Sequence, residues 1–146
     1  MAFALSTTER ITAAPDVAIG ALRDLAGYGR WVSIIGDVVR DGPDAWLVEL
    51  RADLGPLRRS KRLRMVRLDA ESSQSIRFSR SELDGRRHAN WELRLAVEPN
   101  SDESLISVEL DYDGRVPLGP FESLVKAEVS AAARRLESIL SAEPER

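Results

Sequence analysis

The sequence predicts one α+β domain, residues 1–146, in which a curved antiparallel sheet of about six to seven strands wraps around a long C-terminal helix. Two patterns carry this prediction. Between residues 32 and 112, short runs of alternating apolar and polar side chains are separated by turn residues, as in an antiparallel meander. From residue 117 to 140, apolar side chains recur at helical spacing. Because the sheet needs a cover for its apolar face, we expect the helix to lie across it.

The N-terminal part predicts a strand followed by a short helix. In residues 3–11 every second side chain belongs to one partly polar face, which includes Thr7 and Glu9. A helix is expected to start near Pro15 and Asp16, since proline is tolerated in a first turn and an acid is favourable there. The predicted buried side of this helix consists of Val17, Ala21 and Leu25. Gly27 and Gly29 interrupt the helix, and the aromatic pair Tyr28 and Trp31 would cover one end of the core.

The central part predicts a series of strands, with turn signals that include Gly55-Pro56 and a hairpin at Asp84-Gly85. In the long strand that follows this hairpin, alternation places Trp91 and Leu93 on the inner face and His88 on the outer one. The expected strands cover residues 32–39, 46–50, 63–68, 76–83, 89–97 and 106–112.

The final helix carries an acid within its apolar stripe. Glu128 falls among core-facing positions, and a carboxylate there must be hydrogen-bonded, paired or exposed to a polar cavity. The neighbouring small residues Ala131 and Ala132 would leave space beneath the helix. We therefore predict a cavity that Glu128 faces. The apolar stripe consists of Phe121, Val125, Ala132, Leu136 and Ile139, with Leu124 and Val129 at its flanks.

Composition excludes several classes of function. The chain has no cysteine, one histidine, a net charge of −3 and no apolar run near the ~20 residues of a membrane span. We expect a cytoplasmic protein without integral membrane association, nucleic-acid partner, metal or cofactor, and a homodimer stays open. Serine-nucleophile and phosphate-loop motifs are absent from the sequence, which argues against hydrolase and nucleotide-binding functions.

Several short motifs occur along the chain in a characteristic order: Ile11, 13–17, 22–24, Tyr28, Trp31, 66–70, 76–78, 91–93, Pro99 and 106–112. Together with the order of the predicted elements, these motifs resemble the START/Bet v 1-like superfamily, and within it the polyketide cyclase/dehydrase and coenzyme Q-binding branch. The resemblance implies a helix-grip fold that encloses a hydrophobic pocket for lipids, sterols, quinones or polyketides. Some such proteins are cyclases or aromatases, and many only bind or carry a ligand.

Candidate ligand-binding residues follow from the predicted inner face. Glu128 is the first, as a hydrogen-bond donor or general acid for a carbonyl ligand; the alternative is a surface acid at the edge of the helix stripe. Arg80 is its natural partner because it continues the inward phase of its strand, and the alternative is a solvated arginine. Arg135 is too far along the helix for a direct contact with Glu128 on simple spacing. The remaining candidates are the polar Glu9 and Tyr112 and the large apolar Trp46, Met65, Phe78, Trp91 and Leu124.

Three functions remain open at this point. The first is binding or carriage of a hydrophobic or amphipathic small molecule between the sheet and the final helix. The second is a cyclase, aromatase or dehydratase in which Glu128 or Glu9 moves protons and Arg80 steadies an oxyanion. The third is an interaction module that uses the basic segment 58–64.

Overall fold

The computed structural model describes the backbone of residues 3–54, 57–68, 72–114 and 118–142, and the side chains within these ranges except those of residues 52–54, 57–60 and 118–121. The predicted turn at Gly55-Pro56, the helix start at Pro117 and the side chain of Phe121 lie outside the described part. The elements are β1 (Phe3–Ile11), α1 (Pro15–Leu22), the 3₁₀ helix η1 (Leu25–Arg30), β2 (Ile35–Arg40), β3 (Ala45–Leu54), β4 (Leu57–Leu68), β5 (Ser75–Arg80), β6 (Trp91–Asn100), β7 (Glu103–Tyr112) and α2 (Leu118–Ala142).

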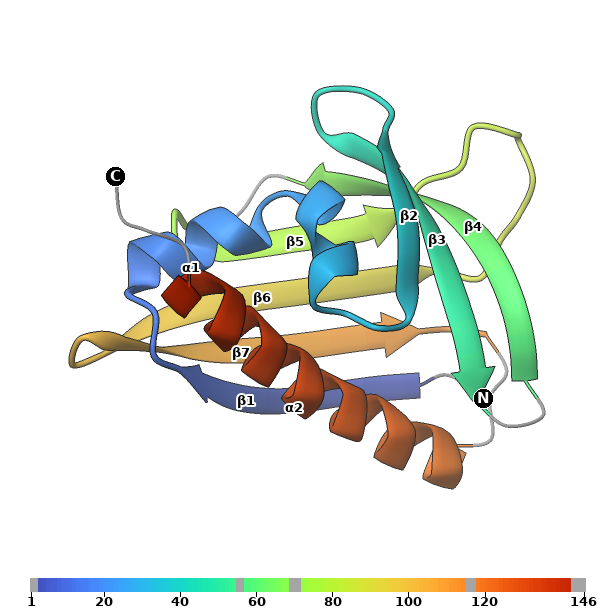
Figure 1. Cartoon of the computed structure of the whole chain (residues 1–146). Helices are drawn as coiled ribbons and strands as arrows, with labels where there is room; N and C mark the ends of the chain where they lie inside the picture. The colour runs from blue at the N-terminus through green and yellow to red at the C-terminus, as the bar shows by residue number, and fades with distance from the viewer. Residues whose placement is uncertain (1–2, 55–56, 69–71, 115–117, 143–146) are drawn as a thin grey trace.

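The seven strands form one antiparallel sheet in the order β1-β7-β6-β5-β4-β3-β2, which confirms the predicted fold class. Only β1 breaks the meander order, because it pairs with β7 at the edge. Figure 1 shows all helices on one side of the sheet, with α2 crossing in front of β1 and β7 and with β2–β4 curving toward the viewer. No helix among the described residues is long and apolar enough to cross a membrane.

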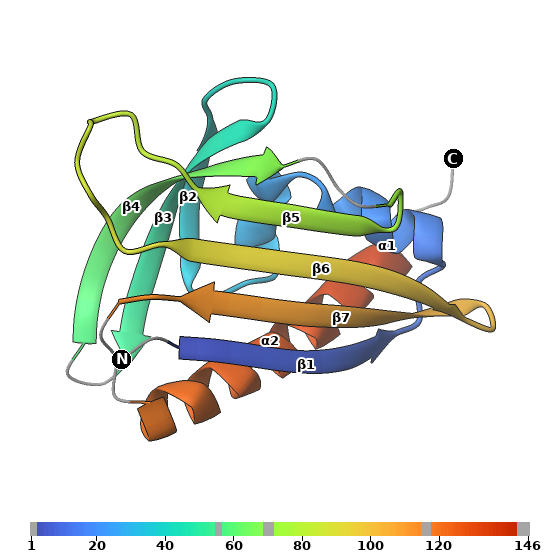
Figure 2. The ribbon, with the colours of Figure 1, turned by 180° about the vertical axis from the view of Figure 1, so that it is seen from behind.

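No helix covers the opposite face of the sheet in the reverse view of Figure 2. Charged side chains of β5, β6 and β7 pair on this face. Arg94 contacts Glu92, Glu109 and Asp111 there, at 3.2, 2.8 and 2.8 Å. Hydrogen bonding to Arg77 outweighs partial burial and lowers the pKa of Glu92. Since this face is charged, the apolar interior lies between the sheet and the helices.

Three aromatic residues organise the core on the inner face. The rings of Trp46 and Tyr28 both meet Phe78 edge-on, with centroids 5.8 and 6.1 Å apart. The Trp46 indole nitrogen donates to Asp24 Oδ1 at 3.1 Å, and Asp24 also caps the start of η1. This cluster fixes η1 against the sheet at one end of the interior.

Three sequence predictions about local structure are wrong. Val17 is 43% exposed, and the buried side of α1 is one residue out of phase, at Ala18 and Leu22. The second strand begins at Ile35, so residues 32–34 connect η1 to β2. Strand β5 ends at Arg80, not at Leu83, and residues 81–90 form a loop in place of a tight hairpin. In this loop the Asp84 carboxylate accepts from the Arg86 backbone N–H and hydrogen-bonds to His88 Nε2.

We predict that Tyr28 makes stability fall at alkaline pH. Its buried hydroxyl donates to the Leu22 carbonyl at 2.6 Å. Burial raises the pKa of Tyr28 above its usual range, and the negative charge of Asp24 raises it further. The folded state therefore keeps a proton that the unfolded chain loses above about pH 10, so stability is present below that pH and falls as pH rises.

Chemical denaturation between pH 8 and 11 tests this. Tyr28→Phe is expected to lower the free energy of unfolding by about 1–2 kcal/mol at pH 8, since it leaves a buried acceptor unpaired, and to remove most of the alkaline loss. Tyr112→Phe is the control and should keep the loss. An alkaline slope unchanged in Tyr28→Phe would contradict the assignment.

Candidate ligand-binding cavity

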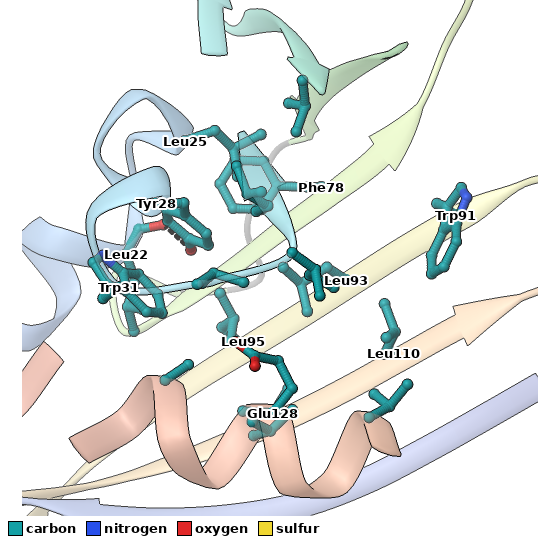
Figure 3. A pocket seen from close by; sticks show the side chains of 18 of the residues that line it. Leu22, Leu25, Tyr28, Trp31, Phe78, Trp91, Leu93, Leu95, Leu110 and Glu128 are labelled. Carbon is teal, nitrogen blue, oxygen red and sulfur yellow. Dashed lines mark hydrogen bonds between the residues drawn. The ribbon is translucent and has the colours of Figure 1, made fainter. Parts of the chain in front are cut away.

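A cavity of about 200 Å³ lies between the inner face of the sheet and α2. Figure 3 shows its walls, with Tyr28 of η1 and Trp31 directly after η1 on one side, Trp91 of β6 on the other and Glu128 of α2 below. Nearly all described lining side chains are apolar, so the space suits an apolar molecule. Members from the sheet include Val48, Leu50, Leu63, Met65, Phe78, Leu93, Leu95, Ile106, Val108 and Leu110.

Small residues on α2 leave this space open. The helix presents Ala132 and Ala133 to the cavity, both buried, between the larger Val129 and Leu136. The sequence pointed to Ala131 and Ala132, so the true position is shifted by one residue. An alanine pair cannot reach the sheet across the gap that leucines would fill, and a cavity results.

Glu128 lies at the cavity wall, as predicted, but its partners differ from the prediction. Its Oε2 accepts hydrogen bonds from the Ser33 backbone N–H at 2.9 Å and from Arg135 Nη1 at 3.1 Å. Its Oε1 accepts from Ser33 Oγ at 2.6 Å. A backbone N–H and a guanidinium can only donate, so Glu128 acts here as an acceptor, not as the donor first expected.

The contact with Arg135 corrects an argument from spacing. Two helical turns separate the two residues, yet the arginine side chain reaches back along the helix and also donates to the Trp31 carbonyl at 3.1 Å. Arginine can do this because its stem is long and its planar head carries five donors. Glu128 and Arg135 together therefore fasten α2 to the segment that joins η1 and β2.

Glu9 fastens the other side of α2. It also lines the cavity, and its Oε2 accepts from Ser130 Oγ at 3.0 Å while Oε1 lies 3.8 Å from Arg134 Nη2. Arg134 donates further to the Arg10 carbonyl of β1. Glu9 of β1 and Glu128 of α2 thus lie on either side of α2 at the border of a mainly apolar space, which Glu92 of β6 also borders.

The structure separates the other candidates into three groups. Met65, Phe78 and Trp91 line the cavity with Glu9 and Glu128. Trp46 is fully buried in the aromatic core and is not among the described lining residues, and Leu124 is 45% exposed on α2.

Tyr112 supports the wall from behind. Its ring stacks on Trp91 with centroids 4.2 Å apart, and the ring is not itself among the described lining residues. Gly114 lies directly against it, because a Cβ at residue 114 would be 2.0 Å from the Tyr112 hydroxyl oxygen. Tyr112 therefore positions Trp91.

Arg80 does not reach Glu128, so the predicted pair is wrong. Its side chain is 4% exposed at the end of β5, where Nε donates to Glu82 at 2.7 Å and Nη1 to the Ala89 carbonyl at 3.1 Å. Strand β5 ends at this residue, and the following loop supplies the partners. His88, expected on the surface, is partly buried between Arg80 and Asp84. Within the described part of the chain, no three His, Cys, Asp or Glu residues are grouped so as to hold a metal.

Ser33 is the site residue that sequence reasoning missed. The sequence pattern predicts a strand at this residue. One of its two hydrogen bonds to Glu128 comes from the backbone N–H, which every residue except proline carries. Its position two residues after the Tyr28/Trp31 pair, which was predicted to cover the core, is the one signal available.

We predict that Glu128 holds the connection between η1 and β2 in place. Glu128→Ala removes the acceptor of Ser33 and Arg135 and should lower the free energy of unfolding by about 1 kcal/mol. Amide exchange at Ser33 should accelerate, as measured by NMR. Glu122→Ala, which removes an exposed acid of the same helix that pairs with Lys126, should change stability by less than about 0.5 kcal/mol. Unchanged exchange at Ser33 would contradict this role.

Comparison with solved structures places this architecture among known ones. A START superfamily protein from Mycobacterium smegmatis is 20% identical, with a TM-score of 0.73 over 94% of this chain and 97% of that one. The Zhui aromatase/cyclase from Streptomyces sp. R1128 is 15% identical, with a TM-score of 0.60 over 96% of this chain and 92% of that one. At these identities the likeness shows a shared fold.

The family assignment comes from sequence. No curated protein matches the chain. The profile of the family described as "Polyketide cyclase / dehydrase and lipid transport" matches residues 2–141, which is nearly the whole chain. The predicted relationship is confirmed, and the chain belongs to this polyketide cyclase/dehydrase and lipid transport family, with its START-like helix-grip fold.

Proposed function

We propose that this protein binds a small hydrophobic or amphipathic molecule in the cavity between its sheet and α2. The observation that carries the proposal is the cavity of about 200 Å³ with almost wholly apolar described walls. An apolar cavity of about 150 Å³ in another protein stays dry and binds benzene. A molecule of about two fused rings is therefore of the right size.

The chemistry of the walls supports binding ahead of catalysis. Glu128 already accepts three hydrogen bonds and Glu9 is held by Ser130 and Arg134, so both carboxylates have structural partners. Arg80, which the cyclase hypothesis needs beside an oxyanion, hydrogen-bonds to the loop after β5 instead. A cyclase or dehydratase that uses Glu9 or Glu128 is the second candidate, since both border the space.

A cavity-filling variant tests the proposal with naphthalene as the probe. Ala132→Leu places extra carbons in the cavity and should weaken naphthalene binding at least about tenfold, measured by NMR titration. The free energy of unfolding should stay equal or rise, because empty space is filled.

Ala127→Leu is the matched control, since Ala127 is exposed on the same helix and is not among the described lining residues. It should bind naphthalene like the unmodified protein. Absence of naphthalene binding, or equal binding by Ala132→Leu, would contradict the proposal.

A further inference from the structure

We infer that the cavity selects ligands whose polar end donates hydrogen bonds, such as a hydroxyl or an ammonium group, and excludes ligands with an anionic end. The inference rests on the proposed binding function and adds the chemistry of the ligand's head group. It is argued from the signs, the partners and the exposure of the charged groups around the cavity.

The charged side chains at the cavity are all acids. Glu9 and Glu128 border it, and the described lining residues include no lysine, arginine or histidine. Glu92 is a third bordering acid, but its carboxylate is paired with Arg77 and Arg94 on the outer face. The charged groups nearest to a ligand in the apolar space are therefore carboxylates, which lie at the margins of the cavity.

The compensating cations lie toward solvent. Arg134 and Arg135 pair with Glu9 and Glu128, yet their side chains remain 51% and 44% exposed, whereas the two acids are 18% and 19% exposed. The carboxylates are thus the more buried member of each pair. An anionic head group in the cavity would lose its hydration and would lie closer to the carboxylates than to the arginines. Both effects are costly in an apolar space.

The hydrogen-bonding capacity at the cavity is that of an acceptor. An ionised carboxylate has about four acceptor positions, and the described donors fill three at Glu128, leaving one on Oε1. At Glu9, the one contact of Oε1 with the described side chains is the longer one with Arg134. Two of the nearby hydroxyl donors are already used, since Ser33 Oγ donates to Glu128 and the Tyr28 hydroxyl to Leu22. The indole nitrogen of Trp91 lies on the far side of its ring from Glu128 (Figure 3).

Three probes with one ring system separate head-group chemistry from apolar fit: 1-naphthylmethylamine, a cation at pH 7, neutral 2-naphthol and anionic 1-naphthoate. Calorimetry gives each Kd for the unmodified protein and its variants. We expect the cation and the naphthol to bind at least about tenfold more tightly than the naphthoate, since a hydrogen bond to a carboxylate is worth about that factor. Both ionic probes pay for lost hydration, so their comparison reports the sign of the charge at the cavity.

Glu128→Gln keeps the size of the side chain and removes its charge, and should reduce the preference for cation over anion several-fold. Glu137→Gln is the matched control, because Glu137 lies on the same helix, accepts hydrogen bonds from Thr12 and Arg134, and is not among the described lining residues. It should leave the preference unchanged. Glu9→Gln provides a second variant if Glu128→Gln does not fold, and is expected to act in the same direction.

The outcomes distinguish the two proposals. Equal binding of all three probes, or tighter binding of naphthoate, would overturn the selectivity while leaving the binding function in place. A preference for the cation that neither glutamine variant changes would have the same consequence. If neutral naphthalene and all three probes fail to bind, the binding function and the selectivity both fall.

Discussion

The width of the curved sheet relative to a single covering helix is the constraint on which this structure depends. Seven strands present one apolar face, and α2 crosses it while η1 and α1 cover one end. The helix is fastened at its two margins by polar contacts, through Glu9 to β1 and through Glu128 to the segment after η1. These contacts hold the helix away from the sheet, and the alanines between them are too short to fill the space that remains.

This arrangement gives the two acids a double role. Their hydrogen bonds hold α2 over the cavity, and we propose that the same carboxylates are the polar groups nearest to a bound ligand. Through Arg135 and Ser33, the position of Glu128 is also tied to Trp31, which lines the cavity. Ligand binding in such a cavity would therefore affect the attachment of α2, because both use the same side chains.

Much of the fold follows from periodicity in the sequence, and the site follows only in part. The alternation in β6 and β7 and the stripe in α2 depend on local repeats, so the sheet, the final helix and the inward position of Glu128 were predictable. The partners of Glu128 were not, since Ser33 contributes a backbone donor from a distant loop and Arg135 reaches over two turns. The predicted position of Arg80 is wrong because β5 ends at this residue and its side chain hydrogen-bonds to the following loop. The alternation of inward-facing side chains along β5 therefore does not extend to Arg80.

The central claim is that an apolar hollow lies beneath α2, and xenon tests it most directly, because this gas enters dry apolar cavities without any head group to guide it. Two-dimensional NMR of the protein under xenon pressure should show saturable shifts that are concentrated in the residues around the cavity, such as Leu95, Val108 and Ala132, and are small on the charged outer face. Shifts that do not saturate, or that are spread evenly over the molecule, would show that the interior is filled and would contradict the account.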